Sequence, residues 1–337
     1  MAEQQERPQL VLYKWAPGWG LPSLSVACLQ VEAYLRLAKI PFAVQDCNAP
    51  SAAPTAQLPV LDAGADLVAP DSGAAAAPGP LAEFAAARVM IDYLKQKCVD
   101  LDRGLTASQR AEAAAYAALL EGKLQPALLY GAWCEAGPFA AHTRPAYGAG
   151  LPFPLSQWAP RATRKALAAH FAATPAAAIY QGAAEALDAL ALRLGSGHPS
   201  PEGGFFFGPQ PSSLDAALYA CLAFLRGAPV VHPSLAKKLA AHRSLASYVE
   251  RLGGAAFAAP APSAADASMD WSAWSGADAD DKYSKARSEK EGELQRKGRR
   301  WLLCAAGAIA AYIFLSGQYI QFEQLVGYEY EEDEDDE

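Results

Sequence analysis

Apolar and polar residues near the N-terminus predict a strand, a helix and a second strand. Residues 10–15 form a short apolar run that Pro17 and Gly18 end, as expected of a buried strand. The apolar residues of the next segment, which Ser23 or Ser25 opens, recur at helical spacing: Leu24, Cys28, Val31, Leu35 and Ala38. A second apolar run at 42–44 predicts another strand. The order corresponds to a β-α-β unit.

Two more strands and a helix follow. The apolar segments 57–61 and 67–69 flank a polar turn that contains Gly64, which predicts a β-hairpin. Pro59 cannot donate a hydrogen bond to a sheet, so we expect it at an edge or in a special turn. The helical pattern resumes over 81–98. This part of the chain is therefore predicted to have the order βαβββα.

From Thr106 onward the pattern is helical. Thr106 and Gln109 have the spacing of a capping box, which predicts a helix from Thr106 to about residue 133. Residues 137–160 are rich in proline and aromatic side chains and are predicted to cross the surface as an ordered, irregular segment. Further helices are predicted over 161–173, 176–194 and 234–252.

Ser212 and Asp215 are the most specific local signal of the helical half. A serine three residues before an acid is the acidic form of a capping box, and an apolar helical stripe follows it. We therefore predict a structural, non-catalytic role for both residues.

One apolar stretch near the C-terminus is long enough to cross a membrane. Residues 301–322 contain no charged side chain over 22 positions, whereas about 20 helical residues span a bilayer core. A buried core helix is the alternative. Residues 282–300 carry eight basic and three acidic side chains, and 329–337 hold eight carboxylates in nine positions. Because no apolar signal segment is found at the N-terminus, the pattern predicts a C-terminal membrane anchor with the body on the positive, cytosolic side.

Composition narrows the function classes. The net charge is −8, but the acidic tail accounts for it, because the other 36 − 8 = 28 acids balance the 28 Lys and Arg. A neutral body has no electrostatic footprint for nucleic acid. Six scattered cysteines without a CxxC pair, and five dispersed histidines, predict neither a metal site nor a cofactor.

Two features together resemble the glutathione transferase fold: the βαβββα order with Leu58-Pro59-Val60, and the run from Phe205 to Ala216. More narrowly, the chain resembles the metaxins, subunits of mitochondrial outer-membrane protein import and β-barrel assembly. The stretches that carry this narrower resemblance are 18–23, 151–155, 193–195 and 205–216. The insertion at 71–80 departs from the family pattern. The resemblance implies a thioredoxin-like half, an all-helical half and a cis peptide bond before Pro59.

The resemblance leaves an enzyme and a scaffold to be distinguished. A transferase needs a hydroxyl at the first strand-to-helix loop, for which Tyr13, Ser23 and Ser25 are candidates, and polar grips such as Asp71 and Ser72. The loop instead contains bulky side chains, which favours a docking loop; a loop packed into the core is the alternative reading. The candidate docking residues are Trp15, Trp19 and Leu21. We therefore expect no catalytic residue, with a membrane-anchored transferase-like enzyme as the alternative function.

The resemblance also implies partners and a location. The partners are the β-barrel insertase of the sorting and assembly machinery, a second metaxin-like subunit, outer-membrane translocase subunits and precursor proteins. The protein is expected in the mitochondrial outer membrane, in contact with lipid, with its tail in the intermembrane space. That tail either attracts basic precursors or only solubilises the chain end. Small residues at helical spacing in the membrane stretch suit close helix contact: Ala306, Gly307, Ala310 and Ala311.

The sequence thus predicts seven segments. They are a disordered N-terminus (1–8), a thioredoxin-like domain (9–100), an all-helical domain (101–252), a linker (253–281), a basic juxtamembrane segment (282–300), a transmembrane helix (301–322) and an acidic tail (323–337).

Overall fold

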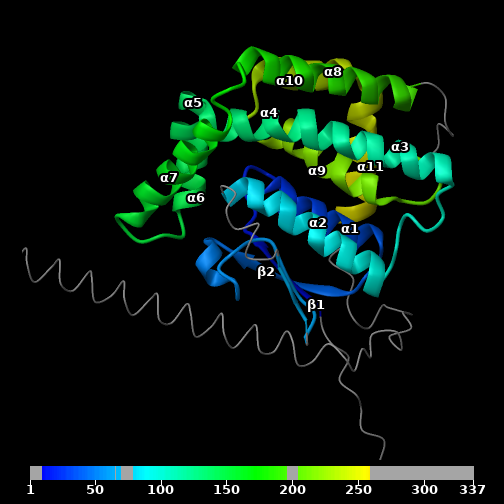
Figure 1. The fold of residues 1–337 in the computed structure, drawn as a ribbon, viewed down its shortest axis with the longest axis horizontal. Coiled ribbons are helices and arrows are strands. Elements are labelled where there is room, and N and C mark those ends of the chain that lie inside the picture. The colour runs from blue at the N-terminus through cyan, green and yellow to red at the C-terminus, as the bar shows by residue number, and fades with distance from the viewer. Residues whose placement is uncertain (1–9, 65, 70–78, 196–203, 259–337) are drawn as a thin grey trace, which may run out of the picture. The chain divides into compact units, whose positions relative to one another are not determined.

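Four strands form one small mixed sheet in the order β2-β1-β3-β4 (Figure 1). The computed structural model describes residues 10–64, 66–69, 79–195 and 204–258. β1 (Leu10–Trp15) pairs in parallel with β2 (Phe42–Cys47) and antiparallel with β3 (Val60–Asp62), which pairs antiparallel with β4 (Leu67–Val68). The βαβββα order predicted from the sequence is confirmed.

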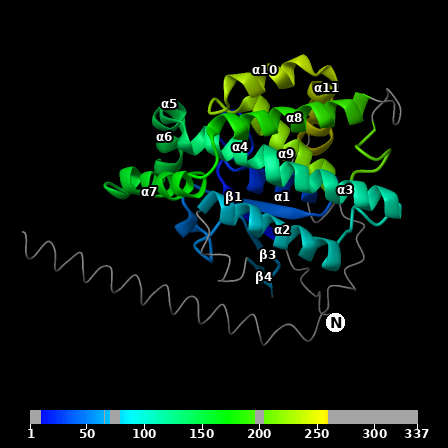
Figure 2. The same cartoon turned by 45° about the horizontal axis from the view of Figure 1, so that its top comes forward.

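Helices make up the rest of the described chain (Figure 2). Their bounds are α1 Val26–Leu37, α2 Gly79–Lys97, α3 Ala107–Leu119, α4 Gln125–Leu129, α5 Ala136–Pro138, α6 Arg144–Gly148, α7 Leu155–His170, α8 Ala176–Gly195, α9 Ser213–Gly227, α10 Pro233–Ala241 and α11 Arg243–Phe257. π-helical turns join several of them, at Leu120–Leu124, Tyr130–Cys134 and Phe139–Thr143.

The β3–β4 hairpin has the turn that its sequence predicts. Gly64 has a φ of +80°, a conformation that glycine adopts without steric cost, and its N–H donates to Asp62 Oδ1 at 2.9 Å. The Leu58–Pro59 peptide bond before β3 is cis, and so is Phe153–Pro154.

The two halves share one hydrophobic core. α1 and α2 lie between the sheet and the helical half (Figure 1), and α1 packs against α2, α9 and α11. The apolar stripe predicted for α1 is buried, including Cys28, Val31 and Leu35. The helix begins after Ser25, which is one of the two start residues predicted from the sequence.

Four predictions for the helical half differ from the structure. α7 begins at Leu155, six residues before the predicted start, and Pro160 lies inside it, although a proline there removes a backbone hydrogen bond and crowds the preceding turn. Short helices and a π-helical turn occupy most of the crossing predicted to be irregular. The single helix predicted over 234–252 is two helices, because His242 leaves helical geometry, with ψ at 87°, and its ring pairs with Asp188 at 2.8 Å. α11 also runs to Phe257, past the predicted start of the linker.

Several sequence predictions lie outside the described residues. They concern the N-terminus 1–8, the insertion at 71–78, most of the linker, the basic segment, the membrane helix 301–322 with its small-residue face, and the acidic tail. Within the residues that the structure describes, no helix has the length and apolar character needed to span a bilayer.

Candidate functional site

The loop between β1 and α1 is held by serine hydroxyls that bond inward. Ser23 Oγ donates to the carbonyl oxygen of Trp15 at 2.8 Å and accepts from the Ser25 N–H at 3.3 Å. Ser25 is the N-cap of α1, and its Oγ accepts from the Cys28 N–H at 3.4 Å. Both serines are buried. The hydroxyls that a transferase site would use are therefore part of the loop's own structure.

Glu83, a buried carboxylate on α2, accepts hydrogen bonds from two residues of this region, Ser25 and Trp15. Ser25 Oγ donates to Glu83 Oε2, and the Trp15 indole N–H donates to Glu83 Oε1 at 2.8 Å. The Glu83 residue is only 8% exposed. Burial raises the pKa of Glu83 to about 7, although the hydrogen bonds from Ser25 and Trp15 act in the opposite direction. The carboxylate therefore ties α2 to the β1–α1 loop.

Glu83 was not predicted from the sequence, because a glutamate in a helix is usually solvated. Only its spacing from apolar residues of the same helix indicates that its side chain is buried. Glu83 lies seven residues before Met90 and eleven before Leu94, so it falls on the buried face of α2.

Aromatic side chains fill the space beside this loop. The Tyr147 ring lies 4.7 Å from that of Trp15 and 4.8 Å from that of Trp133, and its hydroxyl donates to the Leu24 carbonyl at 2.9 Å. Two cavities next to Glu83 measure about 20 Å³ and 120 Å³. Both are smaller than the roughly 300 Å³ at which small-molecule sites begin. We name Trp15, Ser25, Glu83, Trp133 and Tyr147 the closed cluster.

The closed cluster is poorly suited to stabilise a thiolate. Such chemistry needs a hydrogen-bond donor that is free to face the sulfur, whereas Ser25 donates to a carboxylate. Cys28 offers no alternative nucleophile, since burial raises the pKa of its thiol to about 12. The predicted grips Asp71 and Ser72 lie outside the described residues. Among the residues described, no group of His, Cys, Asp and Glu is arranged to hold a metal ion.

The three candidate docking residues do not form one exposed surface. Trp15 is 5% and Leu21 is 8% exposed, so both belong to the core. Trp19 is partly buried and packs edge-on against Phe224 at 5.9 Å between ring centres. Burial thus favours the packed-loop alternative for Trp15 and Leu21, and leaves part of Trp19 at the surface.

Ser212 and Asp215 occupy the start of α9, where Asp215 gathers several donors. Its carboxylate accepts the Ser212 N–H at 2.7 Å, the Phe206 N–H at 2.8 Å and the Tyr248 hydroxyl at 2.5 Å. Ser212 Oγ also donates to the same carboxylate. The two residues form a capping box, in which the Ser212 N–H bonds the Asp215 side chain and the Asp215 N–H faces the Ser212 side chain. Burial raises the pKa of Asp215, although these hydrogen bonds oppose the rise. The pair connects the 205–208 turn, α9 and α11.

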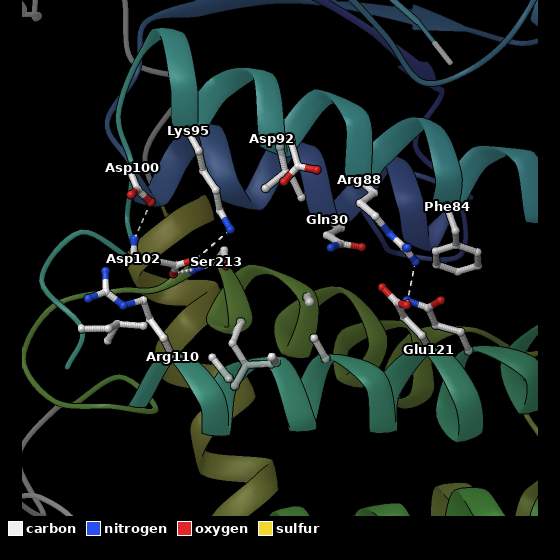
Figure 3. Close-up of a pocket in the computed structure, with 18 residues that line it drawn as sticks. Gln30, Phe84, Arg88, Asp92, Lys95, Asp100, Asp102, Arg110, Glu121 and Ser213 are labelled. Carbon is white, nitrogen blue, oxygen red and sulfur yellow. Dashed lines mark hydrogen bonds and ion pairs between the residues drawn. The ribbon is translucent and has the colours of Figure 1, made fainter. Parts of the chain in front are cut away.

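An open cleft of about 440 Å³ lies between α2 and α3 (Figure 3). Side chains of both charges point into it from the two helices and the loop between them, and the start of α9 contributes to its lining. The charged lining residues are Arg88, Asp92, Lys95, Asp100, Asp102, Arg110 and Glu121. We name this feature the α2–α3 cleft. The α2–α3 cleft was not predicted from the sequence, because its two walls are separate helices.

Ion pairs neutralise much of the charge in the α2–α3 cleft. Lys95 pairs with Asp102 at 2.7 Å, and Arg88 pairs with Glu121 at 2.6 Å. Asp102 also accepts the Ser213 hydroxyl at 2.6 Å. Although burial alone raises it, the bonds from Lys95 and Ser213 leave the pKa of Asp102 below its usual value. The ion pairs therefore link α2 to the α2–α3 loop and to the π-helical turn that follows α3.

Two family models match the chain. Residues 28–164 match the model described as outer mitochondrial membrane transport complex protein. Residues 183–252 match the C-terminal domain of glutathione S-transferase. The second match agrees with the observed architecture, a glutathione-transferase-like fold with a small mixed sheet and a helical C-terminal half.

The individual proteins that are similar in sequence to this chain include metaxins. The chain is 28% identical to metaxin-1 of Sus scrofa over 320 residues, which cover 91% of this chain and 90% of that protein. It is 31% identical to metaxin-3 of Xenopus laevis over 255 residues, covering 72% and 75%. Among solved structures, a glutathione transferase from Phanerochaete chrysosporium aligns with a TM-score of 0.48 at 14% identity, covering 74% of this chain and 98% of that one.

Proposed function

The chain belongs to the metaxin family, and we propose that it is a non-enzymatic subunit of the mitochondrial outer-membrane machinery that imports proteins and assembles β-barrels. The family match described as an outer mitochondrial membrane transport complex protein supports this role. In this proposal the folded body faces the cytosol, residues 301–322 hold it in the membrane, and the acidic tail reaches the intermembrane space. The body then serves as a docking platform for partners and precursors.

The observation that carries the non-enzymatic role is the bonding of Ser25. Its hydroxyl, at the start of α1, donates to the buried Glu83 carboxylate, and the Trp15 indole donates to the same group. A thiolate at this position would lose its donor and meet a carboxylate of the same charge when Glu83 is ionised. Tyr147 and Trp133 also fill the adjacent space. Because a fold by itself does not imply an activity, the likeness to transferases does not oppose this proposal, in which the fold serves as a scaffold.

Purification of the full chain from mitochondrial outer membranes tests the proposed role. A tagged chain, extracted in mild detergent, is expected to bring down a β-barrel insertase and a second metaxin-like subunit, identified by mass spectrometry. A tagged, unrelated tail-anchored protein from the same membranes is the control. Recovery of the chain without any insertase or translocase subunit contradicts the proposal.

A further inference from the structure

Two large aromatic side chains stand almost free in solvent at one end of the helical half. Phe153 is 85% exposed and Trp158 is 72% exposed. Figures 1 and 2 show α5, α6 and α7 grouped at that end, away from α3. Phe153 precedes the first turn of α7 and Trp158 lies within it. They occupy the N′ and N4 positions of the helix, which lie on the same side of its start.

The outward face of α7 continues from Trp158 with positive charge. The buried face of the helix contains Pro160 and Leu167. Arg161 and Lys165 follow Trp158 by three and seven residues, so they share its solvent-facing side, and both are exposed. We name Phe153, Trp158, Arg161 and Lys165 the α7 surface.

The chain around the α7 surface lacks acidic residues. Between Glu135 and Glu185 there is no Asp or Glu, while the basic residues Arg144, Arg161, Arg164 and Lys165 fall in this interval. Two of them already make polar contacts within this stretch. Arg164 donates to the Cys134 carbonyl at 3.1 Å and lies over the Phe139 ring, and Arg161 donates to the carbonyl and the side-chain oxygen of Gln157 at 2.7 and 2.9 Å, so its charge meets only neutral groups there. The α7 surface therefore presents aromatic side chains and cations, and its own stretch of sequence carries no acidic residue.

We propose that the α7 surface binds directly to an anionic lipid membrane. Tryptophan and phenylalanine partition to the interfacial region of bilayers, and basic residues beside them are attracted to acidic headgroups. Both aromatic side chains are mostly exposed to solvent, and neither lines the α2–α3 cleft or the two closed cavities. The contact places the end of the helical half against the membrane, independently of the C-terminal stretch and of any partner.

Fluorescence quenching on the full chain tests this contact. The chain is reconstituted in phosphatidylcholine vesicles with or without phosphatidylinositol, and brominated lipid is used as the quencher. The chain contains seven tryptophans. Comparison with Trp158→Phe therefore isolates the signal of Trp158. We expect Trp158 to be quenched in the anionic vesicles, and the effect to fall in about 1 M salt, where the screening length is about 3 Å.

Removal of charge provides the matched comparison. The double variant Arg161→Gln with Lys165→Gln removes two positive charges. Each lost charge is expected to lower the ratio of the membrane-bound to the unbound state of the α7 surface about fivefold. Lys237→Gln with Arg243→Gln removes the same charge from exposed positions on α10 and α11 and is expected to leave the quenching unchanged. Equal quenching in wild type and Trp158→Phe, or equal effects of the two double variants, overturns the proposal.

A photo-crosslinking amino acid in place of Trp158 identifies what touches the surface in isolated mitochondria. Adducts to phospholipid support the proposal. Adducts mainly to a partner protein, to a second copy of the chain or to its own acidic tail at 329–337 overturn it.

Discussion

Helix α2 borders two regions of opposite character. On one side Glu83 belongs to the closed cluster, where the adjoining cavities measure about 20 Å³ and 120 Å³. On another side Arg88 and Lys95 line the α2–α3 cleft of about 440 Å³. The family resemblance directs attention to the first region, where a transferase would bind its thiol. The second region is open and lined by charged side chains, whereas the first is closed by buried aromatic rings.

The largest expected effect on stability comes from removing the Tyr147 ring, which would open the closed cluster. Tyr147→Ala deletes the contacts with Trp15 and Trp133 and the hydrogen bond to Leu24. We expect the free energy of unfolding to fall by about 4 kcal/mol, as for other buried aromatic truncations. Urea unfolding of the full chain measures it. Tyr147→Phe, which loses only the hydroxyl, is expected to cost about 1 kcal/mol; equal effects of the two variants contradict tight packing at this point.

The next effect concerns the proton on Glu83. Its pKa is about 7 in the folded chain and 4.5 in the unfolded reference, so the folded state binds the proton more tightly. The Glu83 contribution therefore makes the free energy of unfolding fall as the pH rises from about 4.5 to about 7. Glu83→Gln removes this titration, and we expect the variant to gain roughly 2 kcal/mol over wild type between these limits. Parallel pH profiles of the two proteins would show that Glu83 is not buried as described.

Asp102, in the α2–α3 cleft, is expected to change the free energy of unfolding with pH in the direction opposite to Glu83. The pKa of Asp102 is lowered in the folded chain by Lys95 and Ser213. Its contribution is therefore present above the unfolded value of 3.8 and is lost as the pH falls through the lower, folded value. We expect Asp102→Asn to cost about 1.5 kcal/mol at neutral pH, and less in acid. Asp92→Asn, exposed in the same cleft, is the matched control and is expected to change stability little.

The smallest effect belongs to the ion pair at the mouth of the cleft. The side chains of Arg88 and Glu121 are 62% and 44% exposed, so solvent screens their attraction. We expect Arg88→Gln with Glu121→Gln to change the free energy of unfolding by less than about 0.5 kcal/mol. A loss comparable to that of Asp102→Asn would mean that the two ends of the cleft are equally buried.

Local patterns in the sequence predicted most of the fold. The β1 run, the α1 stripe and the Ser212–Asp215 capping box depend on residues within one element, where spacing reports the structure. Contacts between elements were missed. Glu83 meets Ser25 across 58 positions, and the walls of the α2–α3 cleft come from separate helices. Pro160 and His242 misled the prediction because a proline can lie inside a helix and a histidine can leave one when tertiary contacts compensate.

Calorimetric titration of glutathione into the full chain tests the central claim most directly, because the claim is that the thiol position of a transferase is closed. We expect no saturable heat up to about millimolar glutathione, which would mean that any binding free energy is weaker than about −4 kcal/mol. Saturable binding that is lost in Ser25→Ala or Ser72→Ala would contradict the account and restore the enzyme as the better reading.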